Sequence, residues 1–518
     1  MSNEDDATRL GYTEPLRKPS GSAKHESLVL SELPRKSPST DKNESLASTE
    51  PQRKIPGSAK HESLSFAKPT GLIPRRKQGE SAGELPMVRP TKNTPPSFVP
   101  PTPKTCEETG LPMVFLEELV LKSLFFRGEM RGVELVQHLQ LPPSIVNEVV
   151  ESLRREKYVE LYGSTNVSIG KSGMQYRLTR YATEFLKQVL ERSHYHGPAP
   201  VPIEKWAAAT GLQTIRNRPV HAETLRQNLK HLTLPPGTDE RLGPALSAGR
   251  SLFVWGAPGN GKTAICRRVA GCLEDAVFIP HALWVDNFVV RLFDASLHEP
   301  APLPPSLSQQ SCDGRWVYCQ RPFVVVGGEL TLEMLDLVYS PFARIYEAPF
   351  QVKATSGMLL IDDFGRQRVS PKDLLNRWIV PLENDVDFLT FHTGKKVQVP
   401  FDSFIVFSTN LNPTELVDEA FLRRVRYKLE VPAPSLEAFC EIWENECHRH
   451  RMTFSRPLIQ QLIHHCYTLA QRPFAACHPR DLIAQILDIA RYRQCQPELT
   501  PDLLWAAAEN YFSRFAEE

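Results

Sequence analysis

The stretch Ser251–Cys272, SLFVWGAPGNGKTAICRRVAGC, contains three local patterns in immediate succession. It opens with an apolar run, Leu252 to Trp255, which is long enough for a buried strand. A glycine-rich segment follows, and Ile265, Val269 and Leu273 then recur every four residues, as on the buried face of a helix. The stretch therefore predicts a strand, a tight loop and a helix, as in an α/β domain.

The segment between the strand and the helix matches the P-loop pattern of two glycines followed by Lys and Ser/Thr. Its eight residues are Gly256, Ala257, Pro258, Gly259, Asn260, Gly261, Lys262 and Thr263. Glycines let backbone N–H groups approach phosphate oxygens without a Cβ in the way, and a helix N-terminus adds its dipole and unpaired donors. Lys262 can reach the outer phosphates, and the Thr263 hydroxyl can ligate Mg²⁺. We therefore predict that this loop binds a nucleoside triphosphate.

A second apolar run, Met358 to Ile361, leads directly into two carboxylates, Asp362 and Asp363. This pattern predicts a buried parallel strand whose carboxyl end faces the ligand crevice. We expect Asp362 to hold Mg²⁺, directly or through water, and Asp363 to orient and deprotonate the attacking water. A third apolar run, Phe404–Asn410, also ends in polar residues.

Composition limits the classes of protein to consider. The chain has 518 residues, long enough for two or three domains, and its 61 basic and 60 acidic residues predict no general affinity for polyanions. No apolar run is long enough to span a bilayer, and no signal peptide opens the chain. We expect a cytoplasmic protein without membrane insertion.

Cysteine spacing predicts neither a zinc site nor a disulfide scaffold, because the ten cysteines include no C-x-x-C pair. Cys440 with Cys447, and His464-His465-Cys466, come closest to the spacing of metal ligands. Both groups lie in amphipathic helical sequence, so we interpret them as ordinary core or surface residues.

Residues 1–105 are predicted to be a disordered tail, because they hold 15 of the 45 prolines and few aromatic side chains. The tail contains a duplicated motif: Thr13–Leu28 returns nearly unchanged at Thr49–Leu64. A flexible tether is the favoured interpretation, and a repeated partner-binding motif is the alternative.

Residues 106–195 are predicted to form a winged-helix domain, because three helical patterns precede two short strand patterns around a Gly/Ser-rich turn. The third helical pattern occupies the place of a recognition helix and presents Glu148 and Glu151 besides Arg154 and Arg155. Two carboxylates would face phosphates there, and the wing at 164–171 offers one basic residue. Protein docking is therefore favoured over DNA binding. Residues 196–230 are predicted to be a linker.

Together these landmarks resemble the AAA+ ATPases over about residues 230–515. The resemblance implies an α/β nucleotide-binding core at 231–432, a helical lid at 433–518, and ATP with Mg²⁺ as cofactors. It makes Gly256–Thr263 Walker A and Met358–Asp363 Walker B. It assigns Asn410 to sensor 1 and Arg480 to sensor 2. Arg423 and Arg424 correspond to the arginine fingers, which act on the nucleotide of a neighbouring subunit. A hairpin at 391–399 is similar to the insertion that precedes sensor 1 in one AAA+ branch.

Four segments also resemble bacterial predicted ATPases with chaperone-like activity, associated with Flp (tad-type) pilus assembly. They are the winged-helix segment, the stretch His196-Gly-Pro-Ala-Pro-Val-Pro202, Ser251–Thr263 and Ile361-Asp-Asp-Phe-Gly-Arg-Gln367. Two features depart from the AAA+ pattern. Asp363 stands where a longer Glu is usual, which implies slow hydrolysis. The segment between the P-loop and Walker B is longer than in a minimal AAA+ core. Within it we expect a loop at 300–316 and a helix that starts within Gly327–Leu335.

Three functions follow as alternatives. The first is a homo-oligomeric ring or partial ring that hydrolyses ATP and remodels a protein client, bound by the winged helix or the tail. The second is an ATP-dependent nucleic-acid loader or regulator. The third is a nucleotide switch with slow turnover, motivated by Asp363.

Overall fold

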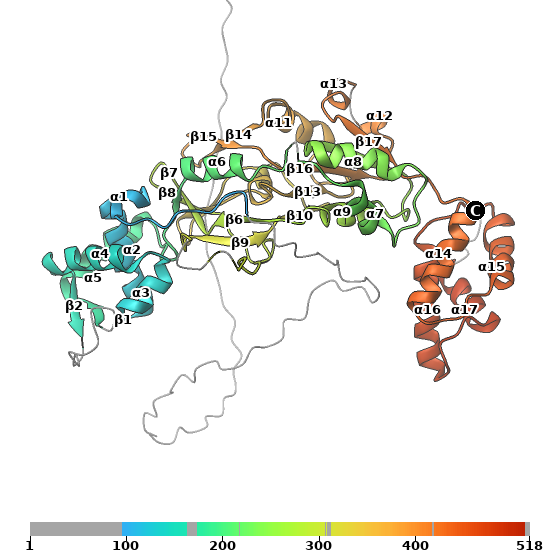
Figure 1. The fold of residues 1–518 in the computed structure, drawn as a ribbon, viewed down its shortest axis with the longest axis horizontal. Helices are drawn as coiled ribbons and strands as arrows, with labels where there is room; N and C mark the ends of the chain where they lie inside the picture. Colours follow the sequence, from blue (N-terminus) through green and yellow to red (C-terminus); the bar gives the residue numbers. More distant parts are fainter. Residues whose placement is uncertain are drawn as a thin grey trace, which may run out of the picture. The chain divides into compact units, whose positions relative to one another are not determined.

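A five-stranded parallel sheet forms the centre of the nucleotide-binding region (Figure 1). The computed structural model describes residues 96–162, 174–216, 218–305, 307, 312–416 and 419–512. The strand order is β10-β13-β16-β5-β17. The strand bounds are Phe323–Val326 (β10), Met358–Ile361 (β13), Phe404–Thr409 (β16), Ser251–Trp255 (β5) and Tyr427–Glu430 (β17). Because all neighbours are parallel, the residues that follow β5, β13 and β16 meet at one edge.

Both faces of this sheet are buried, which explains why its strands are almost wholly apolar. Leu252 and Val254 of β5 face one side, where they pack with α7 (Ala222–Leu229), α8 (Thr238–Ala248) and α9 (Lys262–Ala270). Phe253 faces the other side and packs with residues of α11 (Pro371–Asn384), including Trp378. Helices α9 and α11 can be followed on opposite sides of the sheet in Figure 1.

A second sheet is built largely from chain inserted between α9 and β13. Its order is β11-β12-β8-β7-β4, a mixture of parallel and antiparallel pairs. The bounds are Val338–Ser340 (β11), Ile345–Glu347 (β12), Phe288–Arg291 (β8), Ala282–Val285 (β7) and Val201–Pro202 (β4). Two antiparallel pairs accompany it: β6 (Ala276–Pro280) with β9 (Trp316–Gln320), and β14 (Val386–Thr390) with β15 (Lys396–Pro400).

The N-terminal unit contains the three helices, two strands and final helix predicted for residues 106–195, with a short helix α1 and a short strand β1 that were not predicted. Its assignment as a winged helix stays a prediction. The elements are α1 (Cys106–Thr109), α2 (Met113–Arg127), β1 (Met130–Arg131), α3 (Gly132–Leu139), α4 (Pro143–Arg155), β2 (Val159–Tyr162), β3 (Gln175–Leu178) and α5 (Arg180–Arg192). Strand β3 pairs with both β1 and β2 in an antiparallel sheet. The predicted wing lies outside the described residues.

The second sheet completes the core of the N-terminal unit. Ala282, Val289 and Ile345 are buried in the same apolar cluster as the N-terminal helices. The rings of Phe115 and Trp284 lie 4.1 Å apart between centroids. This continuous apolar contact joins the N-terminal unit to the inserted sheet.

A buried arginine reinforces the same junction. Arg315, only 1% exposed, pairs with Asp313 and donates to the carbonyl oxygens of Thr109 and Pro200 at 3.0 and 3.2 Å. Its guanidinium thus donates hydrogen bonds to backbone carbonyls of both the N-terminal unit and the segment that follows it, while the Asp313 carboxylate balances its charge.

Four α-helices form the C-terminal segment, and Figure 1 shows them in red and orange. They are α14 (Leu436–Arg449), α15 (Arg456–Ile463), α16 (His478–Arg493) and α17 (Pro501–Tyr511), with a π-helical turn at His464–Thr468. Phe439, Trp443, Leu482 and Leu504 contribute to their shared core.

Three segments differ from the sequence predictions. Residues 96–105 were assigned to the tail, but the Phe98 ring packs 5.6 Å from that of Trp316, because an aromatic side chain gains from burial even in Pro-rich sequence. The predicted linker contains α6 (Ile203–Leu212) and α7. The helix predicted at Gly327–Leu335 is wrong: only a 3₁₀ turn, Glu333–Leu335, forms there.

Candidate nucleotide site

The glycine loop lies between the carboxyl end of β5 and the start of α9, as its sequence predicts. Gly256, Gly259 and Gly261 have φ values of 145°, 81° and 84°, which disfavour other residues. A Cβ on Gly256 would lie 2.1 Å from the carbonyl oxygen of Val431, next to β17. The first glycine is therefore required both by its backbone angle and by close packing.

Backbone donors in this loop are available to a ligand. The N–H groups of Ala257, Gly259, Asn260 and Gly261 donate no hydrogen bond to any other residue that the structure describes. They precede α9, whose N-terminal dipole favours an anion. Unpaired donors beside a helix N-terminus fit a bound phosphate chain, which supplies the oxygens that they lack.

Lys262 is buried at the base of the loop. Its ammonium group donates to the carbonyl oxygens of Gly256 and Ala257, at 2.9 and 3.0 Å, and to Oδ1 of Asn410 at 2.6 Å. Burial lowers the pKa of Lys262, while the two carboxylates that follow β13 act in the opposite direction. A phosphate near the ammonium group would further favour its charged form.

Thr263 and Asp362 provide oxygen atoms suited to a divalent cation. The Thr263 hydroxyl donates to Oδ2 of Asp362 at 2.9 Å, so the two side chains converge from α9 and β13. Mg²⁺ prefers oxygen ligands and commonly takes one or two protein groups together with phosphate oxygens. The residues therefore fit Mg²⁺ bound with a nucleotide.

Asp363 and Asn410 lie at the same edge of the sheet. The Asn410 amide donates to Oδ1 of Asp363 at 3.1 Å, while its oxygen accepts from Lys262. One side chain at the carboxyl end of β16 thus connects the loop lysine to the second carboxylate. Asp363 itself has a left-handed backbone, with φ of 51°.

Arg423 and Arg424 lie at the other edge of the sheet. They precede β17, whose Tyr427 is in register with Leu252 near the start of β5, and the Ser251 hydroxyl donates to the Arg424 carbonyl. Gly256 comes four residues after Leu252, which is roughly 13 Å along the strand at the usual rise per residue. Neither arginine therefore joins the site of its own chain.

The two arginines differ in their surroundings. The Arg424 guanidinium donates to Glu383 at 2.6 Å. The Arg423 side chain is exposed and forms no ion pair with a described residue. Arg423 is therefore the more available of the pair.

Arg480 is brought close to the loop by the turn before α16. The Cys477 N–H donates to the Gly259 carbonyl at 2.9 Å, which joins the C-terminal helices to the P-loop. The Arg480 guanidinium donates twice to Oδ1 of Asp481, and the Tyr511 hydroxyl donates to Oδ2 of the same carboxylate. No hydrogen bond joins Arg480 to the loop within the described ranges.

Sequence reasoning missed two residues of this region. Cys477 approaches the loop so closely that a Cβ on Gly259 would lie 2.6 Å from its Sγ. Gln367 forms hydrogen bonds within the turn that carries the two carboxylates. A polar side chain shortly after Gly365 was a usable signal for Gln367, whereas no local pattern indicated Cys477.

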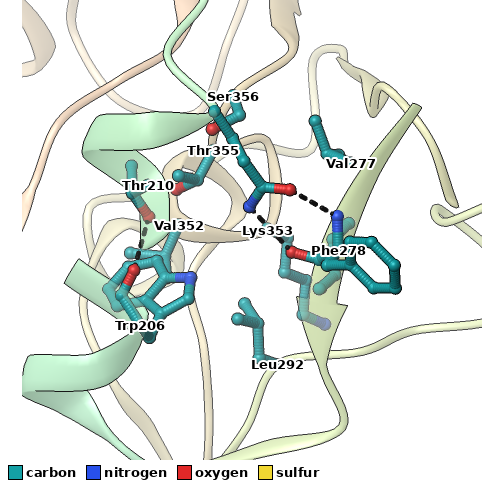
Figure 2. Close-up of a pocket in the computed structure, with 11 residues that line it drawn as sticks. Trp206, Thr210, Val277, Phe278, Leu292, Val352, Lys353, Thr355 and Ser356 are labelled. Carbon is teal, nitrogen blue, oxygen red and sulfur yellow. Dashed lines mark hydrogen bonds between the residues drawn. The ribbon is translucent and has the colours of Figure 1, made fainter. Parts of the chain in front are cut away.

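Figure 2 shows a separate pocket, lined by residues of α6, β6 and the segment around α10 (Phe350–Lys353). There Gln213 bonds both backbone groups of Phe278, accepting from its N–H at 2.6 Å and donating to its carbonyl at 3.1 Å. The Thr355 hydroxyl lies in this pocket without a partner among described residues. Because its paired polar groups join neighbouring elements, we interpret the pocket as part of the scaffold.

Helix α4 presents little free positive charge. Arg154 donates to both oxygens of Glu151 at 3.1 Å, and the Ser144 hydroxyl reaches the Lys104 carbonyl at 3.4 Å. Arg155 is exposed. The residues before α1 thus contact the start of α4, and one of its two arginines is already paired with a carboxylate.

Two further features are absent from the described ranges, a metal-binding cluster of His, Cys, Asp or Glu side chains and a membrane-spanning helix. No group of three or more His, Cys, Asp or Glu side chains there could hold a metal ion, and this holds for Cys440, Cys447 and the His464–Cys466 run as well. No helix there is long and apolar enough to cross a membrane.

Comparisons with known proteins give a coarse likeness. A family model described as a domain of unknown function, DUF8689, matches residues 435–510, the segment of α14–α17. No curated protein matches the sequence. The solved structures that match include NtrX from Brucella abortus in complex with ADP, at 15% identity and a TM-score of 0.32, covering 65% of this chain and 62% of that one.

A point mutant of RuvB from Thermotoga maritima is also similar, at 12% identity and a TM-score of 0.31, covering 56% of this chain and 70% of that one. Both structures are of AAA+ ATPases. The chain spans about three fifths of the NtrX chain. At these TM-scores the likeness carries no argument about function, which rests on the side-chain contacts of the site.

Proposed function

We propose that the chain binds ATP with Mg²⁺ and hydrolyses it. One observation carries the proposal: side chains from α9, β13 and β16 form a connected cluster beside a glycine loop with unpaired N–H groups. A structural P-loop-like turn would not need two carboxylates, an amide and a buried lysine to converge at its mouth.

Each side chain has a distinct part in this proposal. The loop N–H groups and Lys262 bind phosphate oxygens, and Thr263 with Asp362 would hold Mg²⁺, which neutralises phosphate charge when it is bound. Asp363 accepts a proton from water, and Asn410 orients both that carboxylate and the lysine. Water must approach Asp363 closely, because its side chain is one methylene shorter than Glu.

We further propose that the active form is an oligomer, a ring or partial ring. Arg423 is exposed at the sheet edge opposite its own loop, so it can contribute only to the site of another copy. A guanidinium supplied in trans stabilises charge that develops during phosphoryl transfer. Arg480, already close to the loop through Cys477, would contact phosphate if it exchanged its bond to Asp481 for one to the ligand.

For the work driven by ATP, we propose remodelling of a protein partner. The paired Arg154 on α4 supports protein docking over DNA binding by the N-terminal unit. The resemblance to pilus-associated ATPases stays a prediction, because no contact in the site identifies a client. The alternative, nucleic-acid binding, predicts that affinity for duplex DNA falls steeply with salt when the full chain is titrated.

Steady-state ATP turnover tests the main proposal. Turnover per subunit should rise with protein concentration as the oligomer forms, and Asp363→Asn should bind ATP normally while losing about 10²–10⁴-fold in turnover, the usual contribution of a general base. Asp373→Asn, a similar change in the first turn of α11, is the control. Normal turnover in Asp363→Asn would refute the assigned base, and binding without any turnover in the wild type would favour the slow switch.

A further inference from the structure

The turn that carries both carboxylates is held in an unfavourable backbone conformation. It comprises residues 362–367 and follows β13 directly. Asp363 has φ of 51° and Gly365 has φ of 101°. A left-handed conformation is unfavourable for a non-glycine residue, so neighbouring contacts must keep Asp363 in place.

Hydrogen bonds from the sheet fix only part of this turn. The Asp362 N–H donates to the Val326 carbonyl at 2.8 Å, and the Phe364 N–H donates to the Ser408 carbonyl at 2.7 Å. The Thr409 hydroxyl donates to the Phe364 carbonyl at 2.6 Å. These bonds anchor the residues on either side of Asp363 and leave the second half of the turn without sheet contacts.

Within the turn, the Arg366 N–H donates to the Asp363 carbonyl at 3.0 Å, and the Gln367 side chain adds two further bonds. Its amide nitrogen donates to the Asp362 carbonyl at 2.8 Å, and its amide oxygen accepts from the Gly365 N–H at 2.8 Å. The two bonds span the turn on both sides of Asp363. They oppose relaxation of that residue to negative φ, which would turn its carboxylate away from Asn410.

We propose that Gln367 is a positioning residue for Asp363, which holds the carboxylate where it can act on water at the phosphate site. This inference rests on the proposed ATP hydrolysis and assigns a role to a side chain outside the P-loop. Gln367 forms no hydrogen bond to Lys262 or Thr263, and it bonds the backbone of Asp362, not the carboxylate that faces Thr263. We therefore expect it to influence turnover more than nucleotide binding. A misplacement of about 1 Å can cost on the order of 10²-fold in rate.

The test compares two substitutions of similar length in the full chain. Gln367→Met removes both hydrogen bonds, and Gln367→Glu keeps an acceptor for the Gly365 N–H but loses the donor to Asp362. We expect kcat to fall about 10- to 100-fold in the Met variant and less in the Glu variant, with KM and the Kd for ADP within about threefold of wild type. Gln398→Met, on an exposed position of β15, is the control and should leave kcat unchanged.

The outcomes separate positioning from general stability. A folded Gln367→Met variant with wild-type kcat would overturn the inference, as would an equal loss of kcat and ADP affinity. Hydrogen exchange of a peptide that covers residues 362–367 gives an independent readout, and it should quicken in the Met variant but not in the control. A wild type without turnover would refute the proposed function instead, while the exchange measurement would still decide whether Gln367 holds the turn.

Discussion

The two ends of strand β5 carry charged clusters of opposite design. At the carboxyl end, one buried lysine meets an amide and two carboxylates beside unpaired backbone N–H groups. At the amino end, Arg216 and Arg250 both pair with Asp385, Arg216 also reaches Asp402, and Arg424 pairs with Glu383. The first cluster has free donors for a ligand, whereas Arg216, Arg250 and Arg424 are already paired with carboxylates.

This difference teaches that charge density alone does not locate a binding site. The amino-end cluster has more cations than the P-loop, yet each of its three arginines has a carboxylate partner from the same chain. Arg423, beside this cluster, is exposed and without such a pair in the described chain. Groups left without intrachain partners are the ones that ligands or neighbouring copies can use.

The largest effect is expected from Lys262→Met at the carboxyl end. A hydrogen bond to a charged group contributes about 1.5–3 kcal/mol, so ATP affinity should fall by roughly 10- to 100-fold, and turnover should be lost. Isothermal titration with ATP and Mg²⁺ measures the affinity. Arg250→Met at the amino end is the control, and an equal loss of affinity there would contradict the distinction between the clusters.

The next effect separates the neighbouring arginines. Arg423→Ala should lower turnover by about 10³-fold or more with normal ATP binding. Arg424→Ala should lose its partly exposed ion pair with Glu383, and such a pair contributes about 0–1 kcal/mol of stability. Mixing Arg423→Ala with Lys262→Met subunits should restore activity, because one supplies an intact loop and the other an intact arginine. Failure to complement, or a larger loss in Arg424→Ala, would contradict a finger at Arg423.

A smaller effect is expected where the loop meets the C-terminal helices. Gly259→Ala places a Cβ 2.6 Å from Cys477 Sγ at a φ of 81°. We expect a lower Tm and a several-fold weaker Kd for ATP, since about 1–2 kcal/mol is lost to the backbone angle alone. Adding Cys477→Ala removes the steric part, so any deficit that remains in the double variant measures the backbone cost. A Tm unchanged by Gly259→Ala would show that the contact is not tight.

The smallest effect is expected from Asp385→Asn in the amino-end cluster. Arg216 and Arg250 lose a shared carboxylate, but Arg216 keeps Asp402 and the Phe401 carbonyl. Denaturant unfolding should show a loss of about 1 kcal/mol, while ATP affinity stays the same. A change in affinity would indicate that the two ends of the sheet are coupled.

The sequence indicated which side chains meet at the carboxyl end of the sheet, because the patterns that place them are local. Strands β5, β13 and β16 each contain an apolar run. The glycine loop follows β5, and polar residues follow β13 and β16, so parallel pairing places all three segments at one edge. This is enough to bring Lys262, Asp362 and Asn410 together. Roles that depend on another copy, such as that of Arg423, stay predictions.

The second sheet could not be predicted in the same way. Its strands are very short, and β4 pairs with β7 from about 80 residues further along the chain. No periodicity in Val201–Pro202 identifies such a distant partner, because short strands gain their stability from the pairing itself. The burial of Arg315 depends on this sheet, so the sequence did not predict it either.

The junction between the N-terminal unit and the inserted sheet also has a consequence for synthesis. The unit's last helix, α5, ends at Arg192, but its apolar cluster includes Ile345. At a translation rate of about 5–20 residues per second, roughly 8–30 s pass before that strand exists. A nascent chain would expose this apolar surface throughout the interval. The N-terminal unit therefore cannot complete its core until the ribosome has made the strand that contains Ile345.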